Sequence, residues 1–378
     1  MNKFSPLHPI KKDYEKLTEL VYGKLAWGPL FRDEKTDANK VLKNLDNNAE
    51  KYILESLKIM KIKVKNLRNL KVLDIGTGRH ARFFAKHGAI VDHFDLSKDN
   101  VINLNKWAKK NKKKINSFHV NINHSKLQNN FYDIIFLAGV YQHIDIPAFA
   151  LHKFINSLKP KGKMYLGFYR SGEFKFFIVD AIREFMTIKI IKKIRSINSI
   201  LFSFNEKNSY ATSRVMDDFF VPRKHCFHPK DVINDIKLLN GEIFYFKKDL
   251  RDYCHNSKTY FSVGGDRIYI TKKNDRIVKL SKVKKKLKTV KGKNQLHDVK
   301  YKDPKILRNI FLFKSILKKF KDKKISEDNI ISLCIGLYQF TRPCVLEESN
   351  YYQEALRVGR VKMLSIYLEN FLKNFVLD

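Results

Sequence analysis

The sequence predicts an α/β protein built on a doubly wound, mostly parallel sheet of about seven strands. Two observations support this. Short apolar strand patterns alternate with helical patterns between residues 71 and 273, which is typical of right-handed βαβ units. The run Asp133–Ala138 is almost continuously apolar, as expected of a central parallel strand buried on both faces. A helical N-terminal lead-in is expected before this domain, and a small all-helical module after it.

Length and composition are those of a globular protein. The chain has 378 residues, enough for two to three domains of about 100–200 residues each. Hydrophobic residues make up 44% of it, so a sizeable core is expected. None of the four cysteines forms a Cys-x-x-Cys pair, which indicates neither a zinc site nor a disulfide framework and fits a reduced cytoplasmic setting. We find no signal peptide and no apolar run long enough to predict a transmembrane segment.

The charge is strongly unbalanced. The chain holds 75 Lys and Arg against 38 Asp and Glu, a formal net charge of +37. Such a surface attracts polyanions, among them nucleic acid, anionic lipid and acidic glycan. A genome-wide bias toward lysine explains the same numbers equally well, so both interpretations stay open.

The elements follow one another in a regular order. Residues 1–70 are predicted to form a helical cap, with a helix over Asn48–Ile62 leading into the sheet. The domain over residues 71–273 then opens with five strands and three helices. The strands are Val72–Ile75, Ala89–Phe94, Phe118–Ile122, Asp133–Ala138 and Lys163–Phe168, and the helices are Ala81–His87, one reaching residue 114, and Pro147–Leu158.

The rest of the chain divides into four parts. A helical insertion is expected over residues 173–204. A helix then runs from Pro229 to Gly241, followed by closing strands at Glu242–Phe246 and Arg267–Thr271. Residues 274–300 are predicted to be a basic linker, because twelve Lys or Arg and little apolar content fall between residues 272 and 300. Residues 301–378 are predicted to be a helical module.

The central chemical signal is the run from Val72 to Ala81. An apolar strand ends in the turn Gly76-Thr77-Gly78 and opens a helix, and the glycines allow the backbone to approach a ligand closely. Asp95, at the end of the next strand, can accept both hydroxyls of a ribose, so a nucleoside-bearing cofactor is expected. The Gly-x-Gly-x-x-Ala pattern also satisfies the dinucleotide fingerprint, which keeps a dehydrogenase open as an alternative.

Three stretches together resemble the class I (Rossmann-like) S-adenosylmethionine-dependent methyltransferases. They are "VLDIGTG" at residues 72–78, "FYD" at 131–133 and "LKPKG" at 158–162. The resemblance covers roughly residues 70–271 and implies S-adenosylmethionine as cofactor. It also implies the residues of the cofactor site: Asp74, Gly76, Thr77, Gly78, Asp95, Leu96, Asn121, Ile122 and Ala138.

Two positions depart from the family pattern. His80 stands where a third glycine is usual, and Asn121 stands where an acid usually holds the adenine amino group. The amide oxygen of an asparagine can accept the same hydrogen bond. Asn123 is the alternative if the third strand ends later.

The acceptor side is predicted from residues that follow the fourth and fifth strands. His143 is the first candidate for a general base, and Tyr169 and Arg170 are candidates for lining the acceptor site, with Arg170 able to hold an anion. The segment from Asp217 to Val232 is similar to a stretch of small-molecule and glycan-type members that faces the acceptor. It supplies the predicted substrate-binding residues Arg223, His225 and His228. No metal is expected, because no carboxylate or cysteine framework accompanies these histidines.

Four functional hypotheses follow. The first is a methyltransferase acting on an O or N atom of a small molecule, a glycan or a lipid-linked precursor. The second is an RNA methyltransferase that uses the basic linker, although the basic run contains no interleaved aromatic residues. The third is a non-catalytic interaction protein, whose Phe- and Lys-rich insertion contacts anionic membrane. The dehydrogenase ranks fourth.

Overall fold

The computed structural model describes residues 38–171, 221, 223–247, 266–290, 304–326 and 360–375, with a few residues between these stretches. Of the predicted helical cap over residues 1–70, residues 1–37 lie outside the described residues. So do nearly all of the predicted insertion 173–204 and the stretch Asp217–Phe220.

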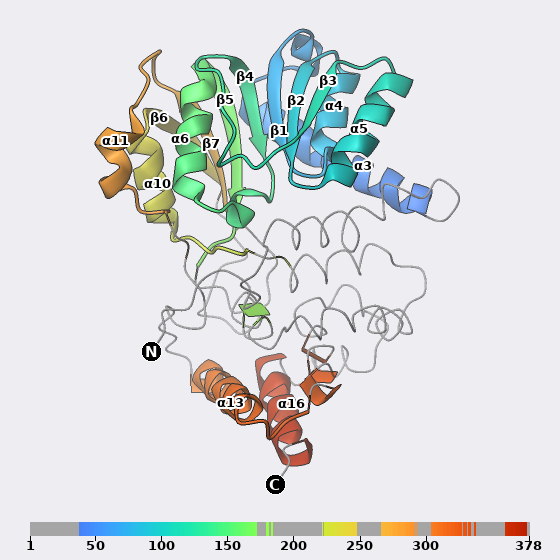
Figure 1. Cartoon of the computed structure of the whole chain (residues 1–378), viewed down its shortest axis with the longest axis vertical. Helices are drawn as coiled ribbons and strands as arrows, with labels where there is room; N and C mark the ends of the chain where they lie inside the picture. The colour runs from blue at the N-terminus through green and yellow to red at the C-terminus, as the bar shows by residue number, and fades with distance from the viewer. Residues whose placement is uncertain are drawn as a thin grey trace.

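Seven strands form one sheet in the order β3-β2-β1-β4-β5-β7-β6. The first five pair in parallel, whereas β7 runs antiparallel to both β5 and β6. The predicted doubly wound, mostly parallel sheet is therefore confirmed (Figure 1). The strands are β1 Lys71–Ile75, β2 Ile90–Asp95, β3 Ile115–His119, β4 Tyr132–Leu137, β5 Leu158–Phe168, β6 Gly241–Lys247 and β7 Asp266–Lys272.

Helices cover both faces of this sheet. Helices α3 (Ala38–Ile59), α4 (Arg79–Lys86) and α5 (Lys98–Lys110) pack on one face, in a core that includes Val72 and Ile134. Helices α6 (Pro147–Ser157) and α10 (Pro229–Leu238) pack on the other face, in a core that includes Leu73 and Ile135. Because neighbouring residues of β1 and β4 point to opposite faces, both central strands bury apolar side chains on both faces of the sheet.

Helix starts agree with the local sequence. Ser97 caps α5 by accepting a hydrogen bond from the backbone N–H of Asn100, as short polar side chains do at helix N-termini. Pro147 and Pro229 occupy the first turn of α6 and α10, where a missing N–H costs nothing.

The third strand differs from its prediction. It spans Ile115–His119 rather than Phe118–Ile122, and only Ile115 is buried in it. As the edge strand of the sheet, β3 lacks the apolar alternation that marks a half-buried strand, so its start was not visible in the sequence. The segment Phe118–Ile122 instead holds the last two strand residues and the turn that follows.

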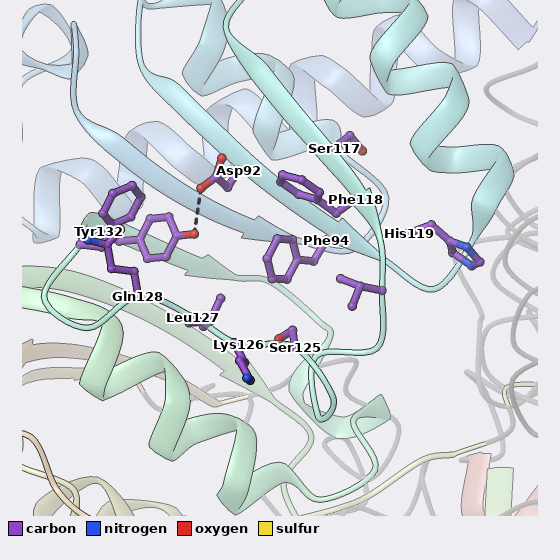
Figure 2. Close-up of a pocket in the computed structure, with 12 residues that line it drawn as sticks. Asp92, Phe94, Ser117, Phe118, His119, Ser125, Lys126, Leu127, Gln128 and Tyr132 are labelled. Carbon is purple, nitrogen blue, oxygen red and sulfur yellow. Dashed lines mark hydrogen bonds between the residues drawn. The ribbon is translucent and has the colours of Figure 1, made fainter.

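The connection from β3 to β4 contains no helix, unlike the two connections before it. The sheet face over β2 and β3 is consequently hollowed into an open pocket of about 670 Å³. Figure 2 shows Phe94 and Phe118 side by side in this pocket, and Tyr132 donating a hydrogen bond of 2.9 Å to Asp92. None of the predicted cofactor residues lines it.

Residues 274–290 are not the solvated linker that their composition predicts. They include α11 (Leu280–Val283) and the short 3₁₀ turn η4 (Lys284–Lys286), beside α10 in Figure 1. Val278 and Leu287 are buried in the same core as α6 and α10. The lysines of this stretch are exposed while Val278 and Leu287 are buried, so charge counting alone gave the wrong environment.

Thr289 anchors this segment to the domain. Its backbone N–H and its hydroxyl each donate a 2.7 Å hydrogen bond to Asp235 of α10, and its carbonyl accepts from Ala148 of α6. Because the hydroxyl proton goes to Asp235, the Tyr141 hydroxyl at 2.9 Å must donate to the Thr289 oxygen. A residue far along the chain is thus fixed beside the end of β4.

Near the C-terminus, α13 (Pro304–Lys321) and α16 (Arg360–Asn374) pack against each other. A buried hydrogen bond of 2.6 Å from Ser365 to Asn309 joins them. These two elements are helical, as the sequence predicts for this region. Within the described part of the chain, no helix is long and apolar enough to cross a membrane.

We expect Thr289→Val to lower the free energy of unfolding by about 1–3 kcal/mol, because it leaves buried Asp235 and Tyr141 short of a hydrogen-bonding partner. Urea unfolding followed by circular dichroism measures this. Lys285→Ala, a change at an exposed position of the same segment, is the matched control and should stay within about 0.5 kcal/mol of wild type. Equal midpoints for Thr289→Val and wild type would contradict the anchoring role.

Candidate cofactor and acceptor site

The turn between β1 and α4 requires glycine at two positions. Gly76 has φ +118° and Gly78 has φ +79°, in the region that L side chains rarely adopt. A Cβ on Gly76 would lie 2.9 Å from Val140 Cγ2, and one on Gly78 would lie 2.8 Å from Leu104 Cδ2. Backbone conformation and close packing therefore impose the Gly-x-Gly pattern together. We call residues 76–80 the glycine bend.

Three hydrogen bonds hold this bend. The N–H of Gly76 donates to the carbonyl of Phe94 at 3.1 Å, and the N–H of Ala81 donates to Asp74 Oδ2 at 3.0 Å. The third joins His93 Nε2 to the carbonyl oxygen of Gly76 at 2.5 Å, with the ring nitrogen as donor. Nδ1 of the same ring lies 2.7 Å from Ser117 Oγ, so a hydrogen bond to β3 holds the imidazole in place.

Asp74 and His80 both support the bend from inside the protein. Asp74 is fully buried, and its Oδ1 lies 3.5 Å from His80 Nδ1. The His80 ring packs into the core 5.1 Å from the ring of Phe136. The histidine in place of the third glycine therefore leaves the bend intact. A direct contact between Asp74 and a methionyl ammonium stays a prediction.

Asp95 ends β2 next to the bend. Its Oδ1 accepts a 2.6 Å hydrogen bond from the Ser97 N–H, and its Oδ2 accepts one of 3.0 Å from the Asn100 side chain. Each oxygen keeps a second lone pair, as a ribose diol requires. Burial raises the pKa of Asp95 to about 6, with the charge of Asp74 adding to the rise, although nearby His93 and the hydrogen bonds lower it.

The turn after β3 places Asn121. Its Oδ1 accepts from the Asn123 N–H at 2.9 Å, and its Nδ2 donates to Asp145 Oδ2 at 3.2 Å. Lys153 of α6 holds this turn. Its Nζ donates hydrogen bonds to the carbonyls of Ile122, Asn123 and Ser125, at 3.0, 2.5 and 2.7 Å. Three further predicted residues, Thr77, Leu96 and Ala138, lie at the same edge of the sheet and are partly exposed.

His143 lies just beyond β4, in the 3₁₀ turn η3 (Tyr141–His143). Its Nδ1 lies 2.7 Å from the carbonyl oxygen of Arg223 and must carry the proton, because a carbonyl can only accept. In the neutral ring Nε2 therefore holds the lone pair. The ring of Tyr169 packs edge-on against His143 at 5.9 Å. The structure thus brings together His143, Tyr169 and Arg223, as the sequence predicts.

The other predicted acceptor residues differ in their surroundings. Arg170 Nε donates to Asp266 at 2.7 Å, so its charge is already balanced. Burial lowers the pKa of His225 to about 3, which leaves it neutral and too weak to act as a base at neutral pH. His228 is exposed and caps α10 through a 3.3 Å hydrogen bond from the Lys230 N–H, away from the buried His225.

Asp145 connects the two halves of the site. One of its oxygens pairs with the guanidinium of Arg223, and the other accepts from Asn121. Arg223 in turn orients His143 through its carbonyl. A continuous chain of contacts therefore runs from the predicted adenine-binding turn to the predicted base.

Residues 73–166, which span the glycine bend, Asp95, Asn121 and His143, match the family model described as "Methyltransferase domain". These residues therefore form a methyltransferase domain, in agreement with the resemblance of the sequence to class I S-adenosylmethionine-dependent methyltransferases. The match favours a methyltransferase over a dehydrogenase and over a non-catalytic protein. It says nothing about the methyl acceptor.

Solved structures with the same general fold are distant. An S-adenosylmethionine-dependent methyltransferase from Mesorhizobium loti is 12% identical, with a TM-score of 0.38, over 57% of this chain and 96% of that one. A putative one from Listeria monocytogenes is 16% identical, with a TM-score of 0.37, over 55% and 92%. TehB from Haemophilus influenzae is 14% identical, with a TM-score of 0.37, over 58% and 61%. No curated protein sequence matches the chain.

The residues of the methyltransferase site fit S-adenosylmethionine. The two positive-φ glycines keep side chains away from the bend, and the exposed Gly139, with φ +71°, does the same at the end of β4. Asp95 retains the lone pairs that a ribose diol needs. When bound, the cofactor supplies an activated methyl group on a sulfonium.

Three residues of the methyltransferase site escaped sequence analysis. His93 joins β2 to the bend, Asn100 holds Asp95, and Lys153 holds the turn that carries Asn121. Only Asn100 left a signal, since the spacing Ser97-x-x-Asn100 after a strand marks a capped helix start. No local pattern announces His93 or Lys153, because both act across long sequence separations.

The raised pKa of Asp95 predicts pH-dependent binding of S-adenosylhomocysteine. The pKa of Asp95 in the folded protein is about 6, above the ordinary 3.8, so burial favours the protonated carboxyl group, and this stabilisation is lost as pH rises through 6. Above pH 6 the group is a carboxylate, whose charge the ribose hydroxyls of the ligand compensate by hydrogen bonding. Affinity measured by calorimetry should be about tenfold weaker at pH 5 than at pH 7.5. Asp95→Asn should bind more weakly with no such dependence, and an equal dependence in this variant would contradict the assignment.

Removing the tie between His93 and the glycine bend should weaken cofactor binding. We expect His93→Leu to raise the Kd for S-adenosylhomocysteine about tenfold, the equivalent of one lost buried hydrogen bond. His93→Gln, whose amide can still donate to the Gly76 carbonyl, should stay within about threefold of wild type. If the leucine variant remains folded by circular dichroism and binds as tightly as wild type, His93 does not position the bend.

Proposed function

We propose that this methyltransferase transfers a methyl group to an O or N atom of a small-molecule, glycan or lipid-linked acceptor, with His143 as the general base. The observation that carries the proposal is the orientation of His143. Its Nδ1–H is held by the Arg223 carbonyl at the carboxyl ends of β4 and β5, so that Nε2 is the nitrogen able to take a proton.

The reaction demands little covalent work from the protein. The glycine bend and Asp95 would hold S-adenosylmethionine, which would supply an activated methyl group to the acceptor atom. The acceptor proton passes to His143 Nε2 and from there to solvent. The protein contributes mainly by holding the reactants in line and excluding water. General base catalysis by His143 adds about 10²–10⁴-fold.

RNA remains a second candidate acceptor, supported by one observation. The ordered segment 273–288 presents Arg276 and seven lysines, all exposed, on a fixed surface. Such a surface attracts phosphates. The absence of aromatic residues within this basic segment disfavours base stacking, so we rank RNA second. Contact of the insertion 173–204 with anionic membrane stays a prediction, because nearly all of these residues lie outside the part of the chain that the structure describes.

We also propose a cytoplasmic location, because the four cysteines form no Cys-x-x-Cys pair and Cys226 is a free, buried thiol, which fits a reducing compartment. The free sulfonium cofactor has to reach the glycine bend from solution. Fractionation of source cells, followed by detection of the protein with an antibody, tests the location directly.

Labelled-methyl transfer tests the role of His143. Wild-type protein is incubated with methyl-labelled S-adenosylmethionine and an extract of source cells. His143→Asn keeps an N–H donor for the Arg223 carbonyl and removes the basic nitrogen. We expect the rate of label transfer to fall about 10²-fold or more, while the Kd for S-adenosylhomocysteine stays within twofold. His124→Asn, at an exposed position, is the matched control. Undiminished transfer by His143→Asn would rule out this base.

Treating the extract with ribonuclease before transfer separates the two acceptor classes. Label should remain in the low-molecular-weight or lipid fraction and be unaffected by the nuclease. Label that disappears with ribonuclease, and transfer that falls steeply between about 50 and 200 mM salt, would favour RNA instead.

A further inference from the structure

Gln142 has an unusual environment. It precedes His143 in η3, and its side chain is fully buried. Neither its Oε1 nor its Nε2 has a hydrogen-bond partner among the residues that the structure describes. Buried carboxamides are nearly always paired, because an unpaired one forfeits its hydrogen bonds to water. A group that the free protein leaves unpaired in this way is typical of a ligand site.

The carboxamide of Gln142 lies between the glycine bend of the predicted cofactor site and the predicted acceptor-binding segment. On one side, its Nε2 lies 3.8 Å from the point that a Cβ on Gly139 would occupy, with no other described atom within 4 Å of that point. The next residue, Val140, packs against Gly76 of the glycine bend. On the other side, the Gln142 carbonyl accepts a 2.7 Å hydrogen bond from the His225 N–H, in the predicted acceptor-binding segment.

Among the described residues, three cations on this side of the site have carboxylate partners. Arg223 pairs with Asp145, and Lys224 forms a buried 2.6 Å ion pair with Asp180. The third cation, Arg170 at the end of β5, pairs with Asp266. His225 is neutral because burial lowers its pKa to about 3. An anionic acceptor would have to compete with a carboxylate for each of these three cations, whereas an uncharged acceptor leaves the pairs in place.

We propose that the carboxamide of Gln142 binds an uncharged polar group of the methyl acceptor, a hydroxyl or an amide, and so selects a neutral acceptor. A carboxamide both donates and accepts, as these groups do, and it carries no charge that would attract an ionised substrate. A site built to pair with such a group rejects an analogue that lacks it, because the buried carboxamide is then left unpaired. The inference rests on the proposed function and assigns it a substrate class.

The test compares Gln142→Met with wild type in the full-length protein. Methionine has similar length and volume and no strong hydrogen-bonding group. Three quantities are measured: the urea midpoint of the ligand-free protein, the Kd for S-adenosylhomocysteine, and label transfer into the low-molecular-weight fraction of a cell extract, separated by anion exchange into neutral and anionic products. Gln128→Met, the same change at an exposed position, is the matched control.

We expect Gln142→Met to unfold at the same urea concentration as wild type or higher, since it removes an unpaired buried group. Its Kd for S-adenosylhomocysteine should stay within twofold, and labelling of neutral products should fall about tenfold or more. Gln128→Met should match wild type in all three.

Each contrary result has a distinct meaning. A lower urea midpoint for Gln142→Met shows that the carboxamide is paired within the protein, and a parallel loss of S-adenosylhomocysteine affinity shows that it binds the cofactor. Wild-type label in anionic products overturns the neutral acceptor while leaving the proposed function in place. If wild type binds the cofactor but labels nothing, or does not bind it, the proposed function fails and this inference fails with it.

Discussion

The left-handed glycine bend between β1 and α4 is the constraint on which the site depends. It is held by the Phe94 carbonyl, by Asp74 and by His93, all from buried strand positions. Because these partners belong to the two strands that flank the bend, the sheet itself fixes the conformation, and no ligand is needed to form it. The same contacts bring the end of β2, with Asp95, next to the bend. Preorganisation of this kind saves the binding free energy that ordering a flexible loop would consume.

Asp145 imposes a second constraint, between the cofactor half and the acceptor half. Its carboxylate serves Asn121 and Arg223 together, and Arg223 orients His143. Removing one partner of such a partly buried pair leaves an uncompensated charge, so the two halves stay in place jointly. A movement of the turn that carries Asn121 can therefore be transmitted to His143, the proposed base, through Asp145 and Arg223. We expect cofactor and acceptor binding to influence each other by this route.

Sequence reasoning succeeded where chemistry is encoded locally. The pattern around Gly76 and Gly78 predicted a strand, a bend and a helix, because only glycine adopts the required φ without strain. The position of His143 just beyond a buried parallel strand was also predicted. Its role as a base stays a prediction, which rests on ligands binding at the carboxyl ends of such strands. Reasoning failed where contacts join distant residues. Edge strand β3 shows no clear alternation, and no pattern links His93 to the bend or Lys153 to the turn that it holds.

The basic segment shows why composition misled and what it hid. Lysines dominate residues 274–290, yet Val278, Leu287 and Thr289 are buried and decide where the segment lies. Thr289 bonds to Asp235 and receives the hydroxyl proton of Tyr141, the residue before Gln142. A segment that follows the last strand of the sheet therefore supports the turn that carries Gln142 and His143. The predicted acceptor side is therefore supported by residues that charge counting alone assigns to solvent.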